Sequence, residues 1–363
     1  MTHWRRAVVE IVVIGLAAVM AWIPLRPDVV ETWFSTGLYP PLQQIVTSLS
    51  NVVPVALLDV LCVAAIAGVL WILTRAVVEV RRVRRVGPVI NALRVLVTSA
   101  AVVYLVFLLL WGLNYRRLPM SERVELTTGA VDPAAVEKLG VETVEQLNAL
   151  HAEAHRDGWI SSPLEDEALR RGFVSAQVAL SDVQPAAPGR LKRTMFGPYF
   201  RWTGVDGMIN PFGLEVLSNP DLLPFERPFV AAHEWSHLAG YADESEANFV
   251  GFLTCMKGSV ATQYSGWLFL YWQVSSEVDA EARGRLSKSL AEGPRRDLQA
   301  IATRLRTGEL PWLRTVGWQV YDEYLKANRV EEGIRSYGAV LTLIVKARFE
   351  PDWTPVRRTQ AKP

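Results

Sequence analysis

The sequence predicts a mainly α fold, in which three N-terminal transmembrane helices precede an α+β domain with a small sheet. Two observations predict it. Hydrophobic residues make up 50% of the 363 residues, and they concentrate in three apolar runs, residues 7–25, 60–78 and 95–113, each long enough to cross a bilayer as a helix. Beyond the third run the composition becomes that of a soluble protein. We therefore assign residues 1–117 to a membrane domain and residues 118–363 to a water-soluble domain.

The first apolar run has an alternative interpretation as a cleavable signal peptide, because Arg5 and Arg6 precede it as the charged region of such a peptide would. Its length and the two runs that follow favour a retained anchor. Asp59 precedes the second run and would be costly inside a bilayer. Since Pro54 lies just upstream, we expect Asp59 to cap a helix at the membrane interface.

The arginines predict the orientation of these helices. Five of them lie at the end of the second run and just beyond it: Arg75, Arg81, Arg82, Arg84 and Arg85. Cytoplasmic loops are enriched in Lys and Arg, so this loop and the N-terminus are predicted to be cytoplasmic, which places residues 118–363 on the outer side. Arg116 and Arg117, which follow the third run, argue against this orientation.

Charge and cysteine content argue against nucleic-acid binding and against a disulfide bond. The net charge is +1 and no basic stripe with interleaved aromatic residues is present, so we expect no nucleic-acid partner. The two cysteines are Cys62, inside an apolar run, and Cys255, in the soluble part, and a disulfide between them is implausible.

The soluble part is predicted to be mostly helical. A polar linker, residues 121–133, leads to a helix that Asp132 caps and that includes residues 141–155, and residues 164–180 form another. Residues 193–210 are aromatic and β-branched with interspersed glycines, which predicts one or two short strands. Residues 251–274 are apolar but interrupted by polar residues, which favours one or two core helices over a fourth span. Further helical stretches are expected in residues 277–347.

The segment ERPFVAAHEWSHLAGYADESEANFVGF, residues 226–252, carries the chemistry. Pro228 suits a helix start and Gly240 a helix end, which predicts a short helix over residues 229–239. His233 and His237 then share one face, as two ligands of a tetrahedral zinc ion require. In this HExxH arrangement Glu234 lies beside the metal, where it can act as general base toward a zinc-bound water.

The third metal ligand is left open among three carboxylates. Glu244 is favoured, because a second helix after Gly240 would place it on one face with Asn248, in the ExxA[DN] spacing of gluzincin metallopeptidases. Glu246 comes next. Asp243 is third, at the spacing where metzincins bring back a ligand after a glycine turn.

Motifs along nearly the whole chain resemble an uncharacterised bacterial family of multi-pass membrane proteins, a domain of unknown function with three N-terminal spans and a zincin-like HExxH domain. The motifs that carry the resemblance are Trp111-Gly-Leu-Asn114-Tyr115-Arg116, Asn210-Pro211-Phe212, HEWSHLAGYADESEANF, Tyr264-Ser265-Gly266, Tyr324-Leu-Lys326 and Ser336-Tyr337-Gly338. The resemblance implies a peptidase in the bacterial inner membrane. Asp243 departs from the family pattern by adding a carboxylate.

Together these observations predict a membrane-anchored zinc metallopeptidase with its catalytic domain outside the cytoplasm. His233, His237 and Glu244 would bind Zn²⁺, Glu234 would activate water, and the partners would be the lipid bilayer and a protein or peptide substrate. Two alternatives stay open. The protein could be a non-catalytic envelope scaffold or sensor stabilised by zinc, or a zinc amidase that acts on cell-wall material.

Other candidate residues are given plainer interpretations. His151 and His155 also stand four residues apart, but no ligand cluster follows them, so we expect a solvated helix face. The aromatic residues between Trp267 and Trp272 are expected to pack in the core or anchor at the membrane. A strand within residues 202–210 is the candidate for pairing with a bound substrate.

Overall fold

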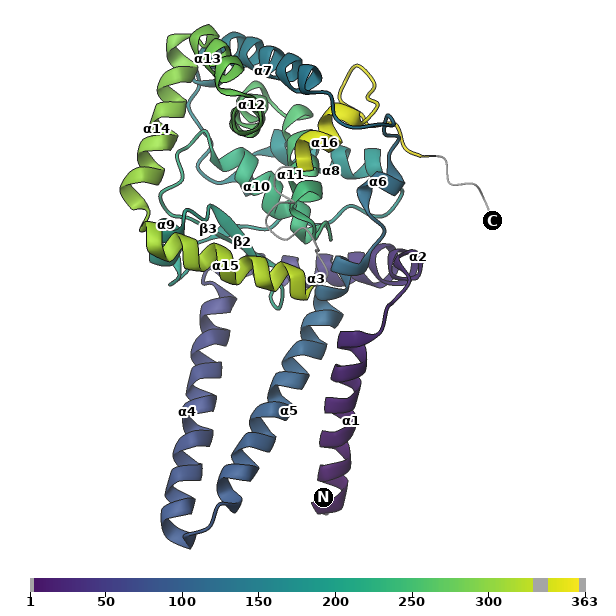
Figure 1. The fold of residues 1–363 in the computed structure, drawn as a ribbon, viewed down its shortest axis with the longest axis vertical. Coiled ribbons are helices and arrows are strands. Elements are labelled where there is room, and N and C mark those ends of the chain that lie inside the picture. The colour runs from purple at the N-terminus through teal and green to yellow at the C-terminus, as the bar shows by residue number, and fades with distance from the viewer. Residues whose placement is uncertain (1–2, 329–338, 359–363) are drawn as a thin grey trace.

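The structure, a computed structural model, describes residues 3–328 and 339–358, so the motif at Ser336 to Gly338 lies outside the described residues. A helical globular body stands on a narrower bundle of long helices (Figure 1). Its elements are α1 (His3–Trp22), α2 (Pro27–Val30), the π-helix η1 (Glu31–Leu38), α3 (Tyr39–Val52), α4 (Leu57–Val83), α5 (Gly87–Leu110), the 3-10 helix η2 (Gly112–Arg116), α6 (Met120–Arg123), α7 (Pro133–Ala154), the 3-10 helix η3 (Pro163–Glu165), α8 (Glu167–Leu180), β1 (Leu191–Lys192), α9 (Gly197–Thr203), β2 (Gly207–Asn210), β3 (Glu215–Ser218), α10 (Arg227–Leu238), α11 (Glu244–Met256), α12 (Val260–Glu277), α13 (Ala280–Ser289), α14 (Glu292–Gly308), α15 (Pro311–Ala327) and α16 (Ala339–Lys346).

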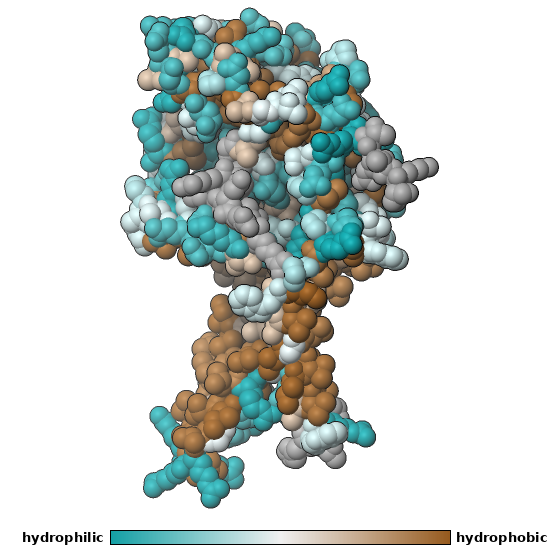
Figure 2. All heavy atoms as spheres, turned by 45° about the vertical axis from the view of Figure 1, so that its right-hand side comes forward, coloured by the Kyte–Doolittle hydropathy of each residue, from teal (hydrophilic) through white to brown (hydrophobic). Residues whose placement is uncertain are grey.

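The narrow bundle consists of α1, α4 and α5, and its surface is hydrophobic (Figure 2). Within the described residues, α4 and α5 are each long and apolar enough to cross a membrane. The first apolar run meets that standard only as a broken pair, Trp4–Trp22 with Pro27–Val52, which bends by 118°. The chain therefore has two candidate spans, or three if the bent pair counts as one. In α1, the charge of Glu10 is paired with Arg94 of α5.

The N-terminus and the turn between α4 and α5 lie together at the end of the bundle farthest from the globular body (Figure 1). Hydrophilic side chains gather at that end (Figure 2). Arg116 and Arg117 lie at the opposite end, where they make internal contacts: Arg116 donates to the carbonyl of Met20 at 2.8 Å, and Arg117 donates to Glu31 at 2.7 Å. Arg116 thus contacts α1 of the bundle, and Arg117 contacts η1, which follows α1 in the chain.

Residues 27–52, assigned above to the membrane domain, instead pack against the globular body. Three side chains from this segment donate to backbone carbonyls of the body at 2.8 Å each: Tyr39 to Leu238, Gln43 to Ala187 and Thr47 to Leu214. Gln43 and Thr47 are fully buried. Burial of polar side chains is favourable here because each one finds a backbone partner.

The start of α4 is held by the globular body. Asp59 lies in its first turn, but it accepts from the backbone N–H of Met195 at 2.8 Å and does not cap the helix. The cap comes from Glu215 of β3, whose carboxylate accepts from the N–H groups of Leu57 and Leu58. The Lys192 ammonium, 2.7 Å from Glu215, neutralises this buried charge.

The predicted helices of the soluble part are present. Asp132 caps α7 and Asp166 caps α8, each through a side-chain hydrogen bond of 3.0 Å, and α11 and α12 form the centre of the core. The expected polar linker is partly ordered by the C-terminal segment, since the N–H of Glu125 donates to the carbonyl of Val356 at 2.8 Å. Cys62 and Cys255 are both free, as predicted.

The small sheet has three strands in the order β1-β3-β2, with β1 parallel and β2 antiparallel to β3. The prediction of one or two short strands within residues 193–210 is confirmed by β2, whereas residues 197–203 of the same segment form the helix α9. That helix starts with Pro198 in its first turn, buries Phe200 and ends at Gly204 in a left-handed conformation, φ 71°. Because β2 is at the edge of the sheet, one of its sides is not paired with another named strand.

Candidate metal centre

Helix α10 carries the HEWSH residues. Pro228 lies in its first turn, and Gly240, with a φ of 83°, turns the chain just after its end, a conformation that favours glycine. Trp235 is fully buried and donates to the carbonyl of Gly189. His233 and His237 share a different face, and their ring centroids lie 4.7 Å apart.

Helix α11 brings Glu244 to these imidazoles. Its Oε2 atom lies 3.4 Å from Nε2 of His233 and 3.5 Å from Nε2 of His237. Zinc bonds of about 2.0–2.2 Å place tetrahedral ligand atoms roughly 3.3–3.6 Å apart, so these separations fit one ion. Glu244 Oε2 is buried and makes no hydrogen bond to any described residue, which leaves its lone pairs available to a metal.

The other two carboxylates have different partners. Asp243 caps α11, because its Oδ1 atom accepts from the N–H groups of Ser245 and Glu246 at 2.9 and 3.1 Å. Glu246 is buried beside Arg123, 3.1 Å away, and it accepts from the N–H of Met120. The structure therefore groups Glu244, and neither Asp243 nor Glu246, with the two histidines.

The charges at this centre depend on one another. Burial alone would raise the pKa of Glu244, but the facing imidazoles hold it well below its ordinary value. Burial alone would lower the pKa of His237, but Glu244 raises it to about 9. The carboxylate thus favours a positive charge among these three side chains, which either a proton or a metal ion can supply.

A backbone contact orients His237, whereas the Nδ1 atom of His233 is buried without a hydrogen-bond partner among the described residues. The Nδ1 atom of His237 lies 2.8 Å from the carbonyl of Tyr241, and a ring that donates there directs its Nε2 lone pair toward Glu244. The last carbonyls of α10 accept hydrogen bonds from residues near the narrow bundle. The His237 carbonyl accepts from the Trp111 indole at 2.9 Å, and the Leu238 carbonyl accepts from Tyr39. Arg117 donates to the next carbonyl, that of Gly240, at 2.9 Å. Helix α10 is thus fixed directly to the part of the chain that leads into the bundle.

Glu234 lies beside the triad in a buried position. Its pKa is raised by burial to about 7, and its Oε2 atom has no hydrogen-bond partner among the described residues. Strand β2 passes against it: a β-carbon added at Gly207 would lie 2.6 Å from Glu234 Oε1. Glycine at this position allows the strand edge to approach the carboxylate.

Tyr321 of α15 is a site residue that the sequence analysis missed. Its hydroxyl donates to Oε1 of Glu244, which leaves the other oxygen facing the histidines. The two residues are 77 positions apart, and no local spacing connects them. Asn248 was expected to support a ligand histidine, but its amide nitrogen is buried without a partner among the described residues.

A cavity of about 530 Å³ opens beside the centre, within the usual size of a ligand site. Both His233 and Glu234 line it, as do residues of β2, α12, α14 and α15. Its apolar wall includes Phe229, Leu268, Phe269, Trp272, Ile301 and Trp318. Between Trp267 and Trp272, the expectation of core packing holds for Trp267, which is 2% exposed, whereas Trp272 lines the cavity.

The second histidine pair is not a solvated helix face, contrary to the prediction. His155 Nε2 lies 2.9 Å from Oδ2 of Asp297, and His151 Nε2 lies 3.5 Å from the same atom. Asp297 belongs to α14, 142 residues beyond His155, so the sequence around the histidines could not reveal the carboxylate.

Comparisons with known proteins give one family. No curated protein and no solved structure matches the chain. A family model described as "Protein of unknown function (DUF3810)" matches residues 34–345, which include α10, α11 and the second histidine pair. Because this match covers most of the 363 residues, the chain belongs to the DUF3810 family.

Proposed function

We propose that this protein is a membrane-anchored, zinc-dependent metallopeptidase with a zincin-like catalytic domain. The observation that carries the proposal is the position of the Glu244 Oε2 atom, which is buried within 3.5 Å of the Nε2 atoms of both His233 and His237. A zinc ion held by these three residues would supply Lewis-acid chemistry, polarising a substrate carbonyl and acidifying a water molecule.

The protein's own residues supply proton transfer and position. Glu234 accepts a proton from the attacking water and returns it to the leaving amine, because its carboxyl group lies beside the triad and lines the cavity. Tyr321 holds one oxygen of Glu244 and so orients the other. Tyr241, through its carbonyl, fixes the ring of His237.

The surroundings favour an extended peptide as substrate. Strand β2 lies at the sheet edge and contacts α10, with Gly207 directly against Glu234. An edge strand can pair with a peptide through backbone hydrogen bonds, while side-chain pockets select its residues. The apolar wall at Phe229, Phe269 and Trp272 suits a large hydrophobic side chain of that peptide.

An alternative is a zinc-stabilised scaffold or sensor without activity. Structural zinc sites are usually closed by four protein ligands, and a carboxylate such as Asp243 would have to supply the fourth. Asp243 is engaged in capping α11, and His233 borders the cavity, so the geometry favours an open coordination position. A zinc amidase for cell-wall material would use the same residues, and only substrate assays separate it from a peptidase.

We also propose that the bundle spans a bacterial inner membrane and that the globular body lies on its extracytoplasmic side. The arginine-rich turn between α4 and α5 and the N-terminus share one end of the bundle, and the body lies at the other (Figure 1). Positively charged loops favour the cytoplasmic side, which assigns the body to the outer side.

The proposed activity is tested with the full chain purified in detergent. We expect it to cleave members of a peptide library, to lose this activity when a chelator removes the metal, and to regain it with Zn²⁺. If the peptides remain intact while isolated peptidoglycan is cut, the result would favour the amidase over the peptidase. A zinc-loaded protein that cuts neither would favour the scaffold.

Substituting Gly207 by alanine is expected to reduce catalysis without removing the metal. The new methyl group would displace the Glu234 carboxylate, and a misplacement of about 1 Å can cost roughly 100-fold in rate. The rate of peptide cleavage and the zinc content are measured together. Gly284→Ala is the matched control, since no atom lies within 4 Å of the added carbon. An unchanged rate of peptide cleavage in Gly207→Ala would show that β2 is not part of the substrate site.

A further inference from the structure

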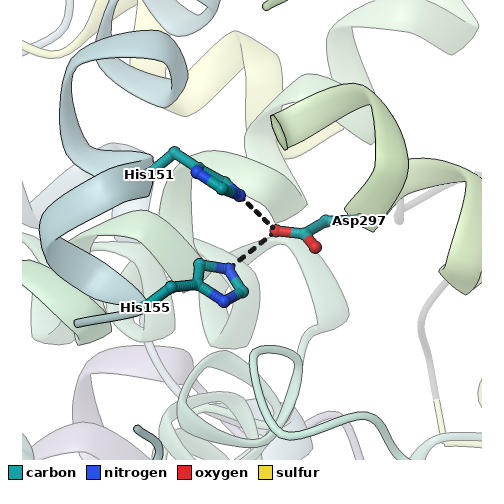
Figure 3. Close-up of side chains that lie close together, drawn as sticks. All are labelled: His151, His155 and Asp297. Atoms are coloured by element: carbon teal, nitrogen blue, oxygen red, sulfur yellow. Dashed lines mark hydrogen bonds and ion pairs between the residues drawn. The ribbon is translucent and has the colours of Figure 1, made fainter. Parts of the chain in front are cut away.

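The second histidine cluster shares no residue with the proposed catalytic site, and none of its three residues lines the cavity. His151 and His155 project from the last turns of α7 toward Asp297 of α14 (Figure 3). Each residue offers one ligand atom, and these three atoms all lie within 4.8 Å of one another. The arrangement repeats that of α10 and α11, in which two histidines one turn apart face a carboxylate from another helix.

The distances are close to those of a metal site. The separation of 3.5 Å between His151 Nε2 and Asp297 Oδ2 equals a ligand-to-ligand distance around zinc, which is roughly 3.3–3.6 Å. His155 Nε2 lies closer, at 2.9 Å, and a small rotation of the ring would open room for an ion. The centroids of the two imidazole rings are 4.4 Å apart, and both Nε2 atoms face the same oxygen, Asp297 Oδ2.

The surroundings hold these side chains in place and leave them accessible. The Tyr264 hydroxyl donates to Asp297 Oδ2 at 2.6 Å and fixes the carboxylate, as a second layer of residues does around metal ligands. The side chains of His151 and His155 are 22% and 31% exposed, which allows an ion to enter from solvent. Gly293 admits α14 to this position, because a β-carbon there would lie 2.4 Å from the His151 ring.

The donor atoms of the cluster also suit a metal. A neutral imidazole keeps the lone pair that a metal requires, and the single carboxylate of Asp297 supplies a negative charge. Two imidazoles with one carboxylate form a donor set that suits zinc and other divalent transition metals.

We propose that His151, His155 and Asp297 bind a divalent transition-metal ion that fastens α7 to α14. The consequence reaches the substrate cavity, because α14 continues from Asp297 to Ile301 and Arg304, which line it. An ion at this second site would therefore stabilise one wall of the cavity without taking part in the reaction. The opposing possibility is a hydrogen-bonded cluster, in which Tyr264 and His155 donate to Asp297 and no ion is needed.

The test counts zinc in the full chain in detergent, stripped with a chelator, reloaded with Zn²⁺ alone and desalted. The double variant His233→Ala/His237→Ala, which lacks the α10 ligands, is expected to keep about one zinc per chain, and the further changes His151→Gln and His155→Gln are expected to remove it. In the otherwise unchanged protein, His151→Gln/His155→Gln should lower the content from about two ions to about one. If the α10 site binds no zinc, the zinc content falls but the ion at His151, His155 and Asp297 remains. The two proposals are therefore tested separately.

Asp297→Asn is a second test of the site, used in case the histidine variants do not fold. The amide oxygen can still accept from Tyr264, so folding should persist, while zinc affinity at the second site should fall by more than the about 10–100-fold that a change outside the ligands causes. Glu153→Gln removes an exposed carboxylate from the same turn of α7 and should change nothing. The proposal is overturned if His233→Ala/His237→Ala binds no zinc while folded, or if Asp297→Asn and His151→Gln/His155→Gln retain the wild-type content.

Discussion

Replacement of Glu234 by glutamine is expected to lower peptide hydrolysis by about 10²–10⁴-fold while the zinc content stays that of the wild type. The amide has nearly the shape of the carboxyl group but cannot accept a proton from water. Zinc binding should persist because the proposed ligand atoms belong to His233, His237 and Glu244. The measurement pairs initial rates on a cleaved peptide with elemental analysis of the same sample.

Glu142→Gln is the matched control for this variant, because Glu142 is exposed on α7. It should keep full activity. A Glu234→Gln protein that hydrolyses peptides at the wild-type rate would eliminate Glu234 as the base. A variant that loses its zinc would instead identify Glu234 as a ligand.

Removal of residues 1–117 is expected to unfold the globular body and abolish metal binding. The missing segment buries Phe34, Tyr39 and Trp111 against the body, and each large side chain contributes about 1.5–3 kcal/mol by burial. It also supplies the hydrogen bonds to the carbonyls of His237 and Leu238, at about 0.5–1.5 kcal/mol each. These losses approach the whole stability of an ordinary domain, about 5–15 kcal/mol.

The fragment 118–363 is compared with the full chain by circular dichroism during thermal unfolding and by zinc content. Trp111→Phe tests the same contact within the intact protein, because phenylalanine keeps an aromatic ring there while losing part of the indole and the N–H that donates to His237. It should lower the free energy of unfolding by about 0.5–1.5 kcal/mol, the loss of one hydrogen bond, because the His237 carbonyl still accepts from the N–H of Gly240 at 3.0 Å. A fragment that unfolds cooperatively and binds zinc as the full chain does would show that the bundle and body are independent.

The sequence predicts those site residues that lie close to one another along the chain. The sequence suffices for α10 and for the approach of Glu244, because helical periodicity, Pro228 and the turn at Gly240 are all local signals. The choice among the three carboxylates could not be made from spacing alone. It follows from packing, since Asp243 turns to the start of α11 and Glu246 to Arg123.

Long-range contacts account for what the sequence analysis missed. Tyr321 reaches Glu244 across 77 residues and Asp297 reaches His155 across 142, and no periodic pattern encodes such pairs. Residues 27–52 were assigned to the membrane domain, yet buried Gln43 and Thr47 bond to carbonyls that only the folded body presents. Aromatic residues in 197–203 favoured a strand, but packing of Phe200 in a short helix prevailed.

The central claim is that His233, His237 and Glu244 hold one divalent ion with a coordination position open to the cavity. Anomalous diffraction at the zinc edge, from crystals of the zinc-loaded full chain, tests it most directly. We predict a peak about 2.0–2.2 Å from the two Nε2 atoms and from Glu244 Oε2, with no fourth protein ligand. Absence of a peak at these atoms, or a fourth protein side chain that closes the coordination shell, would contradict the proposed function.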